Sequence, residues 1–188
     1  MAAAHHLIVG GQRSGKSGQA ERLALAAAAA GSAVTVLATA LALDDEMRAR
    51  IAHHQHTRPA GFDTVEAPLA LAQGLFNIAN TPGRLVVIDC LTLWLTNWLM
   101  PMHGRPDLPG WEAERQALLD VLPGLASPVI FISNEVGWGV SPMTREARFF
   151  VDELGRLNQA VALRCARLTL MVAGQAWTRD VDAGAMNR

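Results

Sequence analysis

Short apolar runs and longer stretches of helical periodicity follow one another along this 188-residue chain. The runs Arg84–Ile88 and Pro128–Ile132 are apolar without alternation, as in strands buried on both faces of a parallel sheet. In the last helical stretch Phe150, Leu154 and Val161 recur at helical spacing and predict a core-facing stripe. Strands are predicted over His6–Gly10, Ala33–Thr39, Phe62–Glu66, Arg84–Cys90, Ser127–Ser133 and Arg167–Ala173. Helices are predicted near Lys16–Ala30, Asp44–His54, Pro68–Ala79, Leu91–Leu99, Trp111–Leu122 and Glu146–Ala166. This alternation predicts one α/β domain over residues 1–188, with a mainly parallel sheet covered by helices on both faces.

A phosphate-binding loop pattern, G-x-x-x-x-G-K-S, lies between the first predicted strand and the first predicted helix. Its residues are Gly10, Gly11, Gln12, Arg13, Ser14, Gly15, Lys16 and Ser17. In this context backbone N–H groups and the helix N-terminus can surround phosphate oxygens. Lys16 is expected to reach the β- and γ-phosphates of a nucleotide, and the Ser17 hydroxyl to ligate Mg²⁺. The alternative is a glycine-rich turn that binds nothing, and the register of Gly15, Lys16 and Ser17 argues against it.

Asp89 ends one of the buried strands and is a candidate for the same metal site. In phosphate-loop enzymes a carboxylate at the end of a neighbouring strand helps to hold Mg²⁺. The alternative is an aspartate that caps the following helix, a position where this residue is favoured. The phosphate loop upstream favours the metal role.

A histidine-rich segment follows an acidic helix start. His53, His54 and His56 include no pair at the i, i+4 spacing, and no cysteine is near, so spacing alone does not indicate a metal site. Two interpretations remain open from the residues. The segment is a solvated helix end, or it carries a histidine nucleophile that forms a phosphoramidate with a nucleotide, with Arg50 and Arg58 balancing phosphate charge.

The bulk composition excludes several partner classes. A formal charge of −1 and the lack of a basic stripe argue against nucleic-acid binding. The longest apolar stretch, Leu91–Met102, contains polar residues and is too short to span a membrane. The N-terminus lacks the features of a signal peptide, and Cys90 and Cys165 fall within apolar segments. We therefore expect a soluble cytoplasmic protein without disulfides.

Three further segments are expected near the site or at the surface. Ser133–Gly139 leaves a buried strand into a glycine-rich loop and is predicted to lie on the ligand-binding edge of the sheet, unless it is an ordinary turn on which Trp138 packs. Gly155 interrupts a long helix, which indicates either close packing, as against a neighbouring subunit, or a tolerated helix glycine. Met100–Gly110, rich in proline and glycine, is predicted to be a mobile loop.

Seven segments, in order along nearly the whole chain, form a pattern more specific than any one of them. They are Gly10–Ser17, Ala38-Thr39, Asp44–Met47, Arg50–His54, Arg58-Pro59, Asn134–Gly137 and Gly155–Gln159. Together they resemble the bifunctional adenosylcobinamide kinase/adenosylcobinamide-phosphate guanylyltransferase family. The phosphate loop alone is generic, whereas the D-D-E-M, R-I-x-H-H and R-P block together with N-E-V-G is far more specific.

The resemblance implies a two-step enzyme of cobalamin biosynthesis on a RecA-like P-loop NTPase fold, assembled as a homotrimer. ATP or GTP phosphorylates adenosylcobinamide, and GTP then donates GMP through a guanylyl-histidine to give adenosylcobinamide-GDP. By position, the resemblance makes His54 the guanylylated residue. It also implies nucleotide contacts at Ala38, Thr39, Ala40, Gln55, His56, Thr57, Arg58 and Glu66, with Asp89 on the nucleotide and its metal. Two positions depart from the family's usual residues: Asp89 stands where glutamate is common, and Ala40 where serine is common.

Two other functions would use the same phosphate loop. One is a small-molecule kinase without the transferase step, and the other is a nucleotide switch that acts on a protein partner. Neither needs His54, so both leave the histidine block and Asn134–Gly137 unexplained together. The tail, residues 178–188, matches no pattern and receives no role.

Overall fold

The computed structural model describes residues 3–41, 45, 48–49 and 59–181. Its strands are β1 (His6–Gly10), β2 (Ala33–Ala38), β3 (Phe62–Glu66), β4 (Arg84–Ile88), β5 (Val129–Asn134), β6 (Arg167–Val172) and β7 (Gln175–Asp180). Its helices are α1 (Lys16–Ala29), α3 (Leu71–Ala79), α4 (Leu91–Leu99), α5 (Leu108–Val121) and α6 (Arg145–Ala162), with a 3₁₀ turn at Leu122–Gly124. The helix predicted over Asp44–His54 lies largely outside the described residues.

The strands form one sheet in the order β3-β2-β4-β5-β1-β6-β7. All neighbouring strands pair in parallel except β6 and β7, which are antiparallel. The predicted α/β fold with a mainly parallel sheet is confirmed. Because parallel strands end at the same edge, the phosphate loop after β1 and Asp89 after β4 lie at one edge of the sheet, formed by the carboxyl ends of the strands. The end of β5 lies between them.

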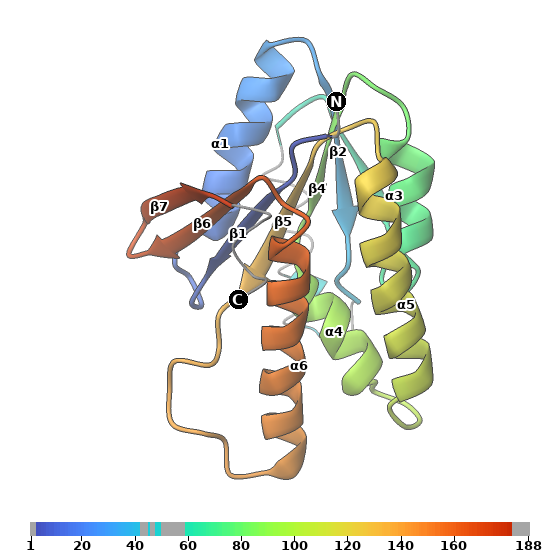
Figure 1. Ribbon diagram of the computed structural model, residues 1–188, viewed down its shortest axis with the longest axis vertical. Coiled ribbons are helices and arrows are strands. Elements are labelled where there is room, and N and C mark those ends of the chain that lie inside the picture. The colour runs from blue at the N-terminus through green and yellow to red at the C-terminus, as the bar shows by residue number, and fades with distance from the viewer. Residues whose placement is uncertain (1–2, 42–44, 46–47, 50–58, 182–188) are drawn as a thin grey trace.

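Helices cover both faces of the sheet, but unequally (Figure 1). On one face Ile8, Val36 and Ile132 pack against α1, which presents the small residues Ala20 and Ala24. On the other face the strands pack against α3, α4, α5 and α6, in the larger of the two cores. The alanine-rich face of α1 lets this helix lie close to the strands, so the residues that open the helix stay near the sheet edge.

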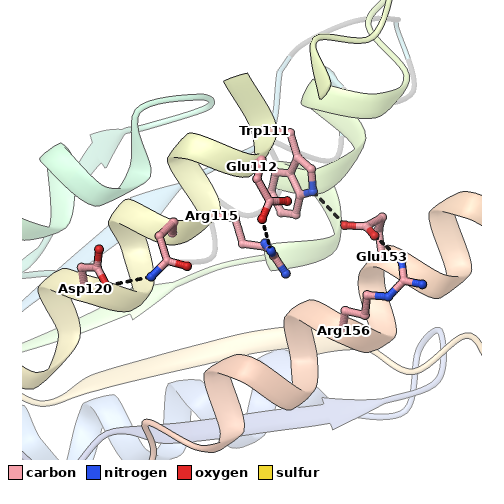
Figure 2. Close-up of polar contacts among 7 residues, drawn as sticks. Trp111, Glu112, Arg115, Asp120, Glu153 and Arg156 are labelled. Atoms are coloured by element: carbon pink, nitrogen blue, oxygen red, sulfur yellow. Dashed lines mark hydrogen bonds and ion pairs between the residues drawn. The ribbon is translucent and has the colours of Figure 1, made fainter. Parts of the chain in front are cut away.

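A buried tryptophan joins the helices of the larger core. Trp111 of α5 is 2% exposed, packs edge-on against Trp94 with ring centroids 5.0 Å apart, and donates from Nε1 to Glu153 Oε2 at 3.0 Å. Figure 2 shows this contact between α5 and α6, with Arg156 paired to the same glutamate. The bond satisfies the only polar atom of the indole, so this large side chain can be buried.

Two elements differ from the sequence prediction. Helix α5 begins at Leu108, inside the segment Met100–Gly110 that we predicted to be a mobile loop, because Asp107 caps it by accepting from Gly110 N at 2.9 Å and Pro109 fits its first turn. Strand β7 was missed altogether, and it takes in residues 178–180 of the tail that received no role. Within the described residues, no helix is long and apolar enough to cross a membrane.

Candidate functional site

The phosphate loop occupies the turn between β1 and α1, at the lower edge of the sheet in Figure 1. Gly15, just before α1, has φ +102°, and Arg13 has φ +54°, so two residues of the loop adopt left-handed backbone. A Cβ added to Gly10 would lie 2.4 Å from the main-chain oxygen of Met171. The close approach of neighbouring backbone therefore requires glycine at position 10, and the left-handed turn favours it at position 15.

The Lys16 side chain folds back toward the start of the phosphate loop. Its Nζ donates to the carbonyl oxygens of Gly10 at 3.0 Å and Gly11 at 2.7 Å. Burial lowers the pKa of Lys16 below its usual range, while the nearby Cys90 thiol acts in the opposite direction. These bonds hold the ammonium group beside the backbone of the phosphate loop. When a nucleotide binds, the ammonium group can exchange these carbonyl oxygens for an anionic phosphate.

The β6–β7 hairpin contacts the phosphate loop. Its turn has positive φ at Ala173 (+50°) and Gly174 (+77°), the backbone that two-residue hairpins prefer. The amide of Gly174 donates to Ser14 O at 2.9 Å, and a Cβ on Gly15 would lie 3.2 Å from Gly174 Cα. The hairpin turn at Ala173-Gly174 therefore packs against the phosphate loop.

Asp89 follows β4 and is held in place by the end of β2. Its Oδ1 accepts from the amide and the hydroxyl of Thr39, each at 3.1 Å. The Asp89 side chain is half-buried, and Ser17 is exposed at the start of α1. No group of three or more His, Cys, Asp or Glu side chains in the described part of the chain could hold a metal alone. One hydroxyl and one carboxylate fit Mg²⁺, which takes its remaining ligands from phosphates and water.

The N-E-V-G segment meets the phosphate loop directly. Asn134, the last residue of β5, pairs in register with Gly10, and Glu135 N donates to Gly10 O at 3.0 Å. Thr92 Oγ1 accepts from Asn134 N at 2.9 Å, and Asn158 Nδ2 of α6 donates to Asn134 O at 3.0 Å. Two segments that the sequence analysis singled out separately are therefore in contact at the edge of the sheet.

The structure places the predicted site residues that it describes along one edge of the sheet, at the carboxyl ends of the parallel strands. Ala38 and Ala40 are half-buried on either side of the fully buried Thr39, and Glu66 is exposed at the end of β3, in register with Ala38. Within the loop Gly11, Gln12, Arg13, Gly15 and Ser17 are exposed, whereas Ser14 and Lys16 are buried. His54, Gln55, His56, Thr57 and Arg58 lie outside the described residues.

The single chain bears on two alternatives that the sequence left open. Trp138 is 71% exposed, which rules out an ordinary turn on which this indole packs. A Cβ on Gly155 would meet nothing within 4 Å, so close packing within the chain does not explain that glycine. Of the three tryptophans Trp94, Trp111 and Trp138, the first two are buried in the core. Trp138 is therefore the one of these three that offers an accessible apolar surface.

The fold and this loop define a P-loop protein of the α/β class, built to bind the phosphates of a nucleotide. The sequence pattern of the cobinamide kinase/cobinamide phosphate guanyltransferase family (CobU) matches residues 6–178. The chain is 51% identical over 168 residues to the bifunctional adenosylcobalamin biosynthesis protein CobP of Pseudomonas aeruginosa, covering 89% of this chain and 92% of that protein. It is 37% identical over 177 residues to the bifunctional adenosylcobalamin biosynthesis protein CobU of Escherichia coli, covering 89% of this chain and 95% of that protein. The chain belongs to the cobinamide kinase/cobinamide phosphate guanyltransferase family.

Proposed function

We propose that this protein phosphorylates adenosylcobinamide with ATP or GTP and then transfers GMP from GTP to the resulting phosphate, giving adenosylcobinamide-GDP for adenosylcobalamin biosynthesis. The observation that carries the proposal is a formed phosphate loop after β1 and a carboxylate held after β4 at the same edge of the sheet, in a chain of this family. This observation favours an enzyme that uses a nucleotide over a protein that merely has the same fold.

The kinase step needs charge neutralisation and positioning more than covalent chemistry. The substrate hydroxyl oxygen attacks the γ-phosphorus, the bond from that phosphorus to the bridging oxygen breaks to release the nucleoside diphosphate, and the hydroxyl proton passes to solvent. Lys16 supplies a cation at the phosphates, and the loop amides together with the start of α1 supply N–H donors. Ser17 and Asp89 would hold Mg²⁺, which when bound neutralises the negative charge on the phosphates.

The transferase step is assigned to His54 through the family pattern. A neutral imidazole nitrogen attacks the α-phosphorus of GTP, so that a P–N bond forms and pyrophosphate leaves. A phosphate oxygen of adenosylcobinamide phosphate then attacks the same phosphorus, and the P–N bond breaks to release the histidine. Gln55, His56, Thr57, Arg58, Ala38, Ala40 and Glu66 belong to the same proposal as residues near the nucleotide.

A homotrimer belongs to the proposal through the family resemblance alone, and a cytoplasmic location through the composition of the chain. Light scattering coupled to gel filtration tests the assembly, with a mass of about three times the 20.1 kDa chain expected. A mass of one chain would contradict that part.

Product analysis by mass spectrometry tests the proposed function and separates its rivals. Wild-type protein with adenosylcobinamide, ATP, GTP and Mg²⁺ is expected to form the phosphate first and the GDP derivative afterwards. Lys16→Ala should form neither product, and His54→Ala should stop at the phosphate. Wild-type protein that also stops at the phosphate would indicate a simple kinase, and no corrinoid product at all would favour a nucleotide switch.

A further inference from the structure

We propose that Thr39 is a positioning residue for Asp89: it fixes the carboxylate that serves the metal and the nucleotide, and does not itself touch the nucleotide. The inference rests on the proposed function, which gives Asp89 its role. It departs from the family resemblance, which placed Thr39 among the residues that contact the nucleotide.

Burial is the first observation behind this inference. The Thr39 side chain is 0% exposed, although the neighbouring Ala38 and Ala40 are only half-buried. Position 39 follows β2, and β2 lies next to β4 in the sheet, so the side chain is enclosed between two strand ends. A fully enclosed hydroxyl reaches only the protein groups around it.

The second observation is which groups accept the hydrogen bonds of Thr39. The Thr39 amide and hydroxyl both lie 3.1 Å from Asp89 Oδ1, and the hydroxyl also lies 2.7 Å from the carbonyl oxygen of Cys90. A hydroxyl has one hydrogen, which these two acceptors share, while the amide donates to Oδ1 alone. Both donors meet the same carboxylate oxygen, and they therefore restrict how the Asp89 carboxylate can turn.

The third observation is that Thr39 is itself anchored. Asn97 of α4 is buried, and its Nδ2 donates to Thr39 O and to Pro68 O, each at 2.8 Å. One amide group thus joins α4, the end of β2 and the segment after β3. Groups that orient a metal-binding carboxylate in this way commonly change metal affinity by about 10- to 100-fold when removed.

The affinity of the protein for a nucleotide with and without metal tests the inference. The probe is the α,β-methylene analogue of GTP, whose P–C bond prevents attack at the α-phosphorus, titrated by calorimetry in Mg²⁺ and in EDTA. We expect Thr39→Val to reduce the gain in affinity due to Mg²⁺ by about tenfold and to leave the affinity in EDTA unchanged. Thr39→Ser, which keeps the hydroxyl, should stay within about threefold of wild type. Thr39→Ala provides the same comparison if the valine variant does not fold.

Thr35→Val is the matched control. Thr35 lies on β2, is 2% exposed, and accepts a hydrogen bond from Arg84 with its hydroxyl. The loss of this hydroxyl therefore reports the effect of removing a buried hydroxyl that does not serve the site. We expect this variant to keep the Mg²⁺ dependence of wild type.

A double-mutant cycle separates the possible failures. Asp89→Asn should remove most of the Mg²⁺ dependence, and Thr39→Val should add no further loss on that background, because Thr39 acts through Asp89. If Asp89→Asn leaves the Mg²⁺ dependence unchanged, the metal role within the proposed function fails. The positioning role alone is overturned if Asp89→Asn abolishes the Mg²⁺ dependence but Thr39→Val does not alter that dependence. It is also overturned if Thr39→Val lowers the affinity in EDTA as much as the affinity in Mg²⁺.

Discussion

The main-chain nitrogen of Glu135 donates a hydrogen bond to the main-chain oxygen of Gly10 across 3.0 Å. This bond joins the loop that leaves β5 to the first residue of the phosphate loop. Asn158 stabilises the same junction from α6, because its Nδ2 donates to Asn134 O at 3.0 Å. Three segments distant in sequence therefore share one junction at the edge where the nucleotide is expected.

Replacing Asn158 with aspartate should weaken this junction. The substitution keeps the shape of the side chain but turns a donor into an acceptor that faces the carbonyl oxygen of Asn134. Because Asn158 is buried, we expect a loss of about 1–3 kcal/mol in the free energy of unfolding, larger at high pH, where the new carboxyl is ionised. Urea unfolding of Asn158→Asp near neutral and acidic pH measures it. Equal stability of variant and wild type at both pH values would show that the junction does not depend on this donor.

Two glycines around the phosphate loop should respond in opposite ways to alanine. A Cβ at Gly10 would lie 2.4 Å from Met171 O, a backbone atom that cannot move alone, whereas a Cβ at Gly18 in α1 would meet nothing within 4 Å. Gly10→Ala should unfold the loop or abolish nucleotide binding. Gly18→Ala should raise the free energy of unfolding by about 0.5–1 kcal/mol, as expected for glycine replaced in a helix. Thermal unfolding and nucleotide titration of the pair test this, and normal binding by Gly10→Ala would contradict the loop geometry.

The stability of the protein should fall in mildly acidic solution through His5. Its Nε2 lies 3.0 Å from Leu122 O and its Nδ1 lies 3.2 Å from Val129 N, so the neutral ring donates once and accepts once. Burial lowers the pKa of His5 below 6.5. The unfolded chain then takes up a proton first as the pH falls. The stability contributed by the neutral ring is intact above the unfolded pKa and is lost as the pH falls through the folded pKa.

His5→Gln is the matched variant for this pH dependence, since glutamine keeps one donor and one acceptor but does not titrate. Between about pH 7.5 and about pH 5 the free energy of unfolding of wild type should fall more steeply than that of the variant. The pKa of His6 is also lowered, by burial and by the charge of Arg167, so part of the slope should persist in the variant. Parallel curves for the two proteins would contradict the assignment to His5.

Two tryptophans should differ sharply in their contribution to stability. Trp111 is 2% exposed and bonded to Glu153, whereas Trp138 is 71% exposed in the segment after β5. Trp111→Ala should cost about 3–5 kcal/mol of the free energy of unfolding. Trp138→Ala should change it by less than about 0.5 kcal/mol. Urea unfolding followed by circular dichroism compares them, and a large cost at Trp138 would mean that this indole is covered in the assembled protein.

Much of the fold could be predicted because its signals are local. Central strands such as β4 and β5 are buried on both faces and read as continuous apolar runs, and the phosphate loop lies between an apolar run and a helix-forming stretch. Strand β7 gave no such signal, since every residue from Gln175 to Asp180 is exposed and only pairing with β6 orders it. The turn at Ala173-Gly174 was the one local clue to the hairpin.

The site was predictable as a set of candidate residues but not in its contacts. Asp89 could be placed at a strand end from the sequence. Its bond to Thr39 depends on β2 lying beside β4, a pairing between residues fifty positions apart in sequence. Thr39 was accordingly grouped with the nucleotide contacts, because its burial arises from strand order and from Asn97, neither of which is visible in a short motif.

Labelling with GTP shows whether His54 forms a covalent guanylyl intermediate. Wild-type and His54→Ala proteins are incubated with Mg²⁺ and GTP carrying the label at the α- or the γ-phosphate, then denatured and examined for bound label. We expect α-label on wild-type protein alone, stable in alkali and lost in acid as a phosphoramidate should be, and no γ-label on either protein. Wild-type protein that binds GTP but takes up no α-label, or His54→Ala protein that takes up as much as wild type, would contradict a guanylyl-histidine at His54.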